Sequence, residues 1–253
     1  MASRNGPPTI FSRRRLDARA ARAKLLGERR EDAHWLAEAL VEDALERIEF
    51  MLLEPDRALV IGRGAGELGR LLERKGWRVT VAETGSLDLE SPYPWGGFAL
   101  IVSLGVLDTV NDLPGAMIHQ RLALGTGGVA MASMVGSGSL KRLRGALLAA
   151  DGERPAARLH PTVDANSGAA LLQRAGFARQ VSDAWSLRLR YGALDDLVAD
   201  LRAQGLTSAL ADAAPPVTRA GLTKAREVFL EGADRHGRVI ETLEIVTLTG
   251  WQG

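Results

Sequence analysis

The chain has 253 residues, of which 46% are apolar and 25% charged, and its net charge is +1. This balance is typical of one large α/β domain in a globular protein. The chain has no cysteine, which excludes disulfides, cysteine-ligated zinc, iron–sulfur clusters and cysteine nucleophiles, and its four histidines have no metal-ligand spacing.

Positive charge is concentrated at the N-terminus, where residues 1–30 hold nine Lys/Arg and two Asp/Glu. Such a run is commonly a solvated helix or an arm that folds back on an acidic body, and a surface for nucleic acid or another anionic partner is the alternative. An Arg-rich targeting segment is a third interpretation, which Asp17 and Glu28 disfavour. No apolar run reaches the roughly 18 residues that span a bilayer, and no secretory signal is visible. We therefore expect a cytoplasmic protein with no membrane span, no metal and no nucleic-acid partner.

The first structured region is predicted to be helical. Residues 16–48 are rich in Ala, Leu, Glu and Arg, and residues 35–48 carry apolar side chains at intervals of three and four, which predicts amphipathic helix, with a break near Gly27. Glu54-Pro55-Asp56 ends this region. We therefore assign residues 1–54 to a basic arm with helices and residues 55–253 to a larger α/β domain.

Short apolar runs alternate with helical patterns in the first half of the larger domain. We predict strands at residues 58–61, 78–82, 98–104 and 129–135, and helices at 67–75 and 113–124. Uninterrupted apolar runs are typical of strands buried on both faces of a parallel sheet. The alternation predicts a Rossmann-like, doubly wound and mostly parallel sheet.

The second half has a different pattern. Helices are predicted at residues 139–150, 167–174, 194–204 and 222–233, and strands at 185–191 and 240–249. Alternation of apolar and polar residues in 185–191 favours a strand buried on one face and paired antiparallel. We expect a helical cap inserted at about residues 136–180, before the last strands.

A glycine-rich turn, Gly62-Arg63-Gly64-Ala65-Gly66, follows the first predicted strand. Glycine permits positive φ and lets the backbone approach a ligand above a helix N-terminus. Glu83 lies 17 residues after Gly66, at the end of the next strand, where an acid accepts hydrogen bonds from ribose hydroxyls. The candidate cofactor-binding residues are Gly62, Gly64, Gly66 and Glu83, together with Ser103 on the third strand.

Two other interpretations of the turn stay open. Residues 64–69 also fit the Gly-x-Gly-x-x-Gly dinucleotide pattern, although the chain has no Tyr-x-x-x-Lys pair. A glycine turn without any ligand is the second alternative, since short motifs also occur by chance.

Further motifs resemble one family over nearly the whole chain. They are Ile10-Phe11 with the arginines after it, the glycine turn, Val110-Asn111-Asp112-Leu113-Pro114, and the segments 171–177, 200–202 and 237–251. The chain is similar to class I methyltransferase-like proteins of alphaproteobacteria, to the related mitochondrial complex I assembly factors and, more distantly, to biotin-synthesis methyltransferases. The resemblance implies S-adenosylmethionine as the cofactor and an unidentified methyl acceptor.

The chain departs from this family at several positions. Val60 stands where the family has an Asp that orders the turn, Ala99 replaces the Asp of a Phe-Asp pair, and Asp108-Thr109 replace His-Trp. Only 14 residues separate Glu83 from Phe98, where a full family member has a helix and a strand that supply the adenine pocket. Either Asp88 or Trp95 replaces this wall, or the pocket is lost and the fold serves as a scaffold.

Methyl transfer from a sulfonium chiefly needs the two reacting groups to be aligned, so the sequence assigns no catalytic residue. Arg158 and His160 are candidate substrate-side groups, because an ordinary histidine pKa near 6.5 suits a base. A surface loop histidine that caps the next helix is the alternative for His160, and Asp164 is interpreted as a turn or N-cap residue.

Two functions follow from the sequence. One is an S-adenosylmethionine-dependent methyltransferase, in which Gly64→Val is expected to abolish binding and leave the fold intact. The other is a degenerate, non-catalytic protein that binds a partner or assists respiratory-complex assembly. Some relatives are linked to hydroxylation of an arginine, but the missing cysteines and scattered histidines give that chemistry little support.

Overall fold

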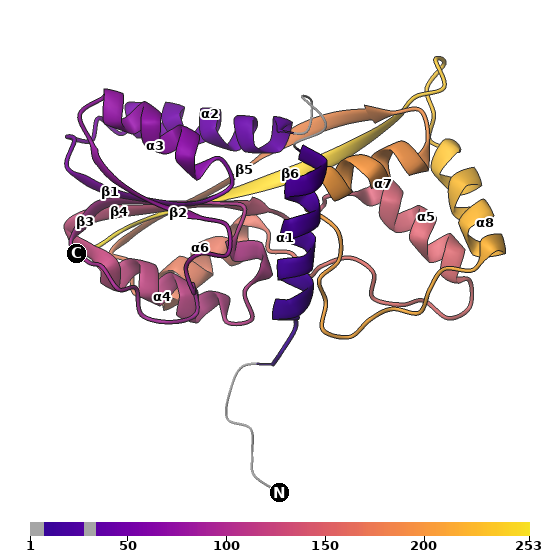
Figure 1. Ribbon diagram of the computed structural model, residues 1–253, viewed down its shortest axis with the longest axis horizontal. Helices are drawn as coiled ribbons and strands as arrows, with labels where there is room; N and C mark the ends of the chain where they lie inside the picture. The colour runs from indigo at the N-terminus through magenta and orange to yellow at the C-terminus, as the bar shows by residue number, and fades with distance from the viewer. Residues whose placement is uncertain (1–7, 28–33) are drawn as a thin grey trace, which may run out of the picture.

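The computed structural model describes residues 8–27 and 34–253, and it is built around one six-stranded sheet (Figure 1). The strand order is β2-β1-β3-β4-β6-β5. The strands are β1 (Arg57–Gly62), β2 (Arg78–Glu83), β3 (Phe98–Leu104), β4 (Leu124–Val135), β5 (Arg179–Tyr191) and β6 (Val239–Trp251). β1 to β4 pair in parallel, whereas β6 runs antiparallel to both β4 and β5.

The register of the parallel strands fixes where the candidate site lies. Gly62 at the end of β1 pairs with Glu83 of β2 and with Leu104 of β3. The glycine turn, Glu83 and the segment after β3 therefore meet at one edge of the sheet, where ligands bind in doubly wound folds.

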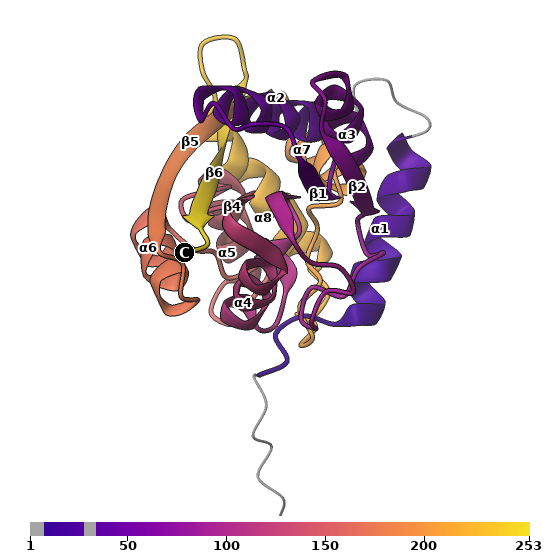
Figure 2. The ribbon, with the colours of Figure 1, turned by 90° about the vertical axis from the view of Figure 1, so that its left-hand side faces the viewer.

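Helices cover both faces of the sheet (Figure 1). They are α1 (Arg13–Gly27), α2 (Trp35–Phe50), α3 (Ala65–Arg74), α4 (Leu113–Ala123), α5 (Lys141–Asp151), α6 (Ala165–Arg174), α7 (Leu194–Ala203) and α8 (Arg219–Leu230), with a 3₁₀ turn η1 (Leu107–Thr109). One face carries α2 and α3, the other α4 and α6, and α1 stands across the end of the sheet (Figure 2). Two apolar clusters result, one on each face, and burial of such apolar surface is the main stabilising contribution to the fold.

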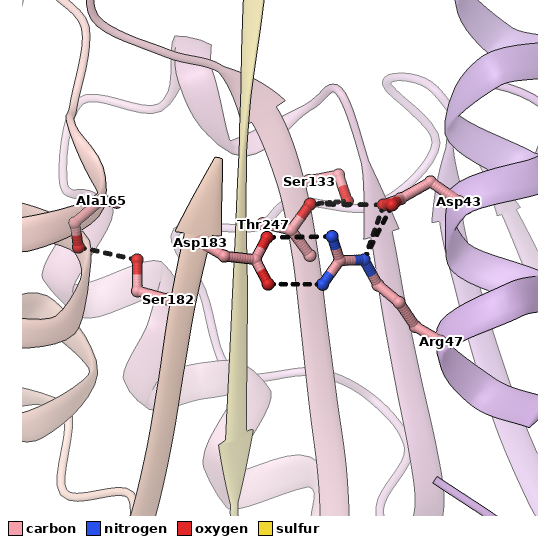
Figure 3. A network of polar contacts seen from close by, with 7 residues as sticks. All are labelled: Asp43, Arg47, Ser133, Ala165, Ser182, Asp183 and Thr247. Carbon is pink, nitrogen blue, oxygen red and sulfur yellow. Dashed lines mark hydrogen bonds and ion pairs between the residues drawn. The ribbon is translucent and has the colours of Figure 1, made fainter. Parts of the chain in front are cut away.

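A polar network fastens α2 to the antiparallel half of the sheet (Figure 3). The Arg47 guanidinium donates to both Asp43 oxygens at 2.9 Å and to Asp183 of β5 at 2.7 and 2.9 Å. Asp43 also accepts from Thr247 of β6 at 3.4 Å, and Thr247 lies 3.1 Å from the Ser133 hydroxyl. Burial raises the pKa of Asp43, although its bonds to Arg47 oppose the rise.

The structure confirms the Rossmann-like α/β fold and refines the expected elements. Residues 84–97 form no helix or strand, so β2 is an edge strand, as the short segment after Glu83 implies. β5 begins at Arg179, earlier than expected, because its first half is solvent-exposed and lacks an apolar signal. Within the expected insertion at about residues 136–180, α5 packs against α8 and α6 packs on β5 and β6, and the helical cap itself stays a prediction. The boundary at 54/55 stays a prediction.

Within the described residues, the helices are too short or too polar to cross a membrane.

Candidate cofactor-binding site

A cavity of about 410 Å³ lies at the carboxyl ends of β1, β2 and β3. Its walls come from α1, the ends of β1 and β2, residues 84–90, residues 105–111 and Gly205. In Figure 2, α1 stands beside β2 and β1 and closes this side of the molecule. The volume falls within the roughly 300–1,000 Å³ of small-molecule sites.

Gly62 and Gly64 shape the turn and do not line the cavity. Gly62 has φ +101°, and a Cβ there would clash with the Leu104 carbonyl and come within 2.7 Å of Val106 Cγ1. Gly64 has φ +66°, and a Cβ there would lie 2.7 Å from Val41 Cγ2 of α2. The expectation that Gly64→Val leaves the fold intact is therefore corrected: the glycine is required by packing and backbone conformation.

Gly66 lies beside Glu83, although only Glu83 lines the cavity. A Cβ at Gly66 would stand 3.3 Å from Glu83 Oε1, so the glycine leaves room beside the carboxylate. Glu83 lines the cavity and its side chain is exposed. Ser103, by contrast, is fully buried, accepts a 2.6 Å hydrogen bond from Gln120, and does not reach the cavity.

The short segment after Glu83 forms a wall. Asp88 lines the cavity, and its pKa is lowered because it accepts hydrogen bonds from the Ser91 hydroxyl and the Glu90 N–H. Glu90 accepts from the Asp112 N–H at 2.7 Å, which ties the segment to the start of α4. Trp95, the other sequence candidate, is 43% exposed and does not line the cavity.

Two family-like motifs, about 100 positions apart, meet to hold α1 in place. The side-chain oxygen of Asn111 accepts the N–H groups of Ile10 and Phe11 at 2.7 and 2.8 Å. Phe11 is buried and pairs with Leu210. This contact, which we call the Asn111 latch, fixes the start of α1, a helix with no buried residue of its own.

Arg63 lies inside the glycine turn and ties it to neighbouring segments, whereas Val60 on β1 has no polar group that could do so. Val60 is fully buried in the apolar core. The Arg63 N–H donates to the Leu104 carbonyl at 2.9 Å, and its guanidinium donates to the carbonyls of Gly105, Gln204 and Gly205. The side chain thereby joins the turn to the segment after β3 and to the end of α7.

The substrate-side candidates line a second, smaller cavity of about 50 Å³ that shares Arg19 with the first. Arg158 is paired with Asp151 of α5. His160 Nε2 accepts the Ala209 N–H at 2.8 Å, and burial, reinforced by Arg19, lowers its pKa to about 4. His160 is thus neutral, half-buried and engaged at Nε2 with Ala209, which follows α7. It does not cap the next helix, α6, which Asp164 caps by accepting the Ser167 N–H.

The lining of the larger cavity is compatible with an S-adenosyl group, the ligand that the sequence resemblance implies. The glycine beside Glu83 leaves space for a sugar, and the Asp88 carboxylate is accessible for an exocyclic amine. Among residues 8–27 and 34–253, no three acidic or histidine side chains gather closely enough to hold a metal.

Sequence reasoning missed Arg19, Arg63 and the Asn111 latch. A long cationic side chain between two glycines of the turn was a visible signal for Arg63. The sequence around Arg19 contains no comparable signal, because Arg19 is one of several arginines on a basic helix. Only the packing of α1 against the rest of the protein distinguishes it from the others.

Comparison with known proteins identifies the family of the chain. A methyltransferase domain model matches residues 29–180. A malonyl-[acyl-carrier protein] O-methyltransferase of Halorhodospira halophila is 29% identical over 88% of this chain and 83% of that protein. The mitochondrial arginine-hydroxylase NDUFAF5 of Rattus norvegicus is 29% identical over 64% of this chain, but the match spans about half of that relative, 48%.

A solved structure shows the same fold. It is the Burkholderia thailandensis 1,6-didemethyltoxoflavin-N1-methyltransferase with bound S-adenosylhomocysteine, at 15% identity and a TM-score of 0.52, and the match covers 98% of this chain and 94% of that one. With the family model matching more than half of its length, this chain belongs to the methyltransferase domain family.

Proposed function

We propose that the chain is an S-adenosylmethionine-dependent methyltransferase whose cofactor lies in the larger cavity. The observation that carries this proposal is the placement of Glu83 and Asp88 on one cavity at the carboxyl ends of β1, β2 and β3. Two carboxylates there are suited to a ribose and an adenine amine, which are hydrogen-bond donors.

The chain's own groups bind the cofactor, orient it and exclude water. Bound S-adenosylmethionine supplies an activated methyl group on a sulfonium. The smaller cavity adjoins the Arg19 side of the larger one and is the proposed acceptor site. Its Asp108 Oδ1 is buried without a hydrogen-bond partner in the described part of the chain, and is therefore suited to accept a hydrogen bond from the methyl acceptor.

Arg158 and His160 contribute to this site by position. Arg158 is held by Asp151, and His160 by the Ala209 N–H. We propose that both side chains shape the acceptor cavity. Neither acts as a base through the atoms that already form these hydrogen bonds.

Calorimetry with S-adenosylhomocysteine tests the proposal. We expect saturable one-site binding by the wild type, weakened by Glu83→Gln and unchanged in Glu73→Gln, an exposed position on α3 away from the cavity. Absence of binding at millimolar ligand would reject the enzyme proposal.

The alternative is a non-catalytic protein of the same family that acts in assembly of a respiratory complex. Two observations favour it: Val60 lacks a polar group, and Arg63 already satisfies three carbonyls around the turn. It predicts a stable protein partner in pull-downs and no adenosyl ligand in the purified protein. Native mass spectrometry that finds a co-purified adenosyl ligand would reject it.

A further inference from the structure

Among the charged side chains that line the larger cavity, Arg13 and Asp17 of α1 form an ion pair with each other. The other charged side chains are divided between two ends. Glu83, Asp88 and Glu90 come from β2 and the segment after it. Arg63 lies at the opposite end, because its guanidinium reaches Gly105 after β3 and Gly205 after α7. We call these the acidic end, which lies toward edge strand β2, and the basic end, which Arg63 forms together with Arg19 of α1.

The two guanidinium groups of the basic end have neutral partners. Arg19 donates to the Thr207 carbonyl at 3.2 Å, and Arg63 donates to three carbonyls. Across residues 8–27 and 34–253, no carboxylate lies within ion-pair distance of either. The charge of Asp108 acts on both, but its Oδ1 makes no hydrogen bond. Two enclosed cations thus face one carboxylate, an imbalance that an anion in the cavity would relieve.

Both arginines keep donors for such an anion. A guanidinium has five N–H donors; within the described residues Arg19 uses one and Arg63 three. A carboxylate accepts paired N–H donors from arginine in a planar arrangement, which makes it a well-matched ligand.

Two glycines make room for this arrangement. A Cβ at Gly105 would lie 2.8 Å from Arg63 Cδ, and one at Gly205 would lie 3.1 Å from Ala23 Cβ on α1. The backbone therefore lets the Arg63 side chain lie flat and lets α1 approach closely enough to bring Arg19 over the cavity.

We infer that Arg19 and Arg63 form an anion subsite that holds the carboxylate of the cofactor's amino-acid end. This inference rests on the proposed function. Glu83 at the acidic end and the two arginines at the basic end together set the direction in which the ligand lies. The subsite also makes α1 part of the binding site, since Arg19 reaches the cavity only when α1 is docked.

The test compares S-adenosylmethionine with decarboxylated S-adenosylmethionine, which lacks only the carboxylate. Calorimetry on the full chain is expected to show that the wild type prefers the intact ligand by roughly 10- to 100-fold, as for a charged hydrogen bond. Arg19→Gln should lower this ratio of dissociation constants toward one by weakening the intact ligand alone, because the carboxylate then keeps only Arg63. Arg22→Gln, an exposed change on the same helix, should keep the wild-type ratio.

The outcomes are separable. Equal affinity of the wild type for both ligands, or an unchanged ratio in Arg19→Gln, would overturn the anion subsite and leave the proposed function standing. Failure of the wild type to bind either ligand would overturn the proposed function and the subsite with it. If Arg19→Gln melts at a lower temperature than the wild type, Arg19→Lys allows the same measurement with the positive charge kept. The preference of Arg19→Lys for the intact ligand should be smaller than that of the wild type but still above one. An undiminished preference would contradict the paired-donor geometry.

Discussion

The acidic and basic ends of the cavity differ in how the chain builds them. Glu83 and Asp88 lie five positions apart in the sequence and are placed by one strand and the segment after it. Arg19 and Arg63 come from distant segments and depend on α1, on the glycine turn and on carbonyls after β3 and α7. One local segment therefore provides the part of the proposed site that binds the nucleoside of the cofactor. The part that binds its amino-acid end forms only when α1 packs against the rest of the fold.

The largest expected effect comes from disrupting the glycine turn that carries Arg63 of the basic end. Gly64→Val should lower the free energy of unfolding by about 2–5 kcal/mol, because it adds backbone strain and a clash with Val41. Urea denaturation measures this loss. Gly145→Val on α5, where a Cβ meets nothing within 4 Å, is the matched control and should change stability by less than about 0.5 kcal/mol. Equal stability of both variants would show that the turn tolerates side chains.

A pH titration probes the region beside the basic end. His160 has a folded pKa of about 4, mainly through burial and secondly through Arg19, with Asp108 opposing. Because the unfolded histidine titrates near 6.5, the unfolded chain binds more protons between the two values, and stability is lost as pH falls through this window. The loss attributable to His160 is up to about 3 kcal/mol. His160→Gln, which keeps an acceptor for Ala209, should remove that part of the slope; identical pH profiles would contradict the assignment.

Glu83→Gln affects the acidic end alone. It should weaken both S-adenosylmethionine and its decarboxylated form by about 10- to 100-fold, since a charged acceptor of the ribose is lost. The ratio between the two ligands should stay at the wild-type value, which calorimetry can measure. A change in that ratio would mean that the two ends are not independent.

Asn111→Ala affects the basic end through the Asn111 latch. Two N–H groups lose their acceptor, which should cost about 1–2 kcal/mol of stability and weaken the carboxylate-bearing ligand more than the decarboxylated one. Thermal melting and calorimetry measure the two effects. Asn166→Ala, at an exposed position on α6, is the control. A latch variant that binds both ligands like the wild type would separate α1 from ligand binding.

The fold was largely predictable from the sequence, because buried parallel strands and glycine turns are local patterns. Glu83 was predicted to face a ligand on the same grounds, and it lines the cavity. Ser103 could not be distinguished from its neighbours on β3. The strand is buried on both faces, so its sequence shows no alternation of polar and apolar residues that would indicate which side chains face the cavity. Arg19 and Asn111 could not be paired with the cavity, because their contacts span about 190 and about 100 positions of sequence.

A crystal structure of the protein with S-adenosylhomocysteine tests the central claim most directly. We expect the ribose hydroxyls to bind Glu83, the adenine to lie beside Asp88, and the carboxylate to lie between Arg19 and Arg63, with α1 packed over it. A ligand bound in the reverse direction, or outside this cavity, would contradict it.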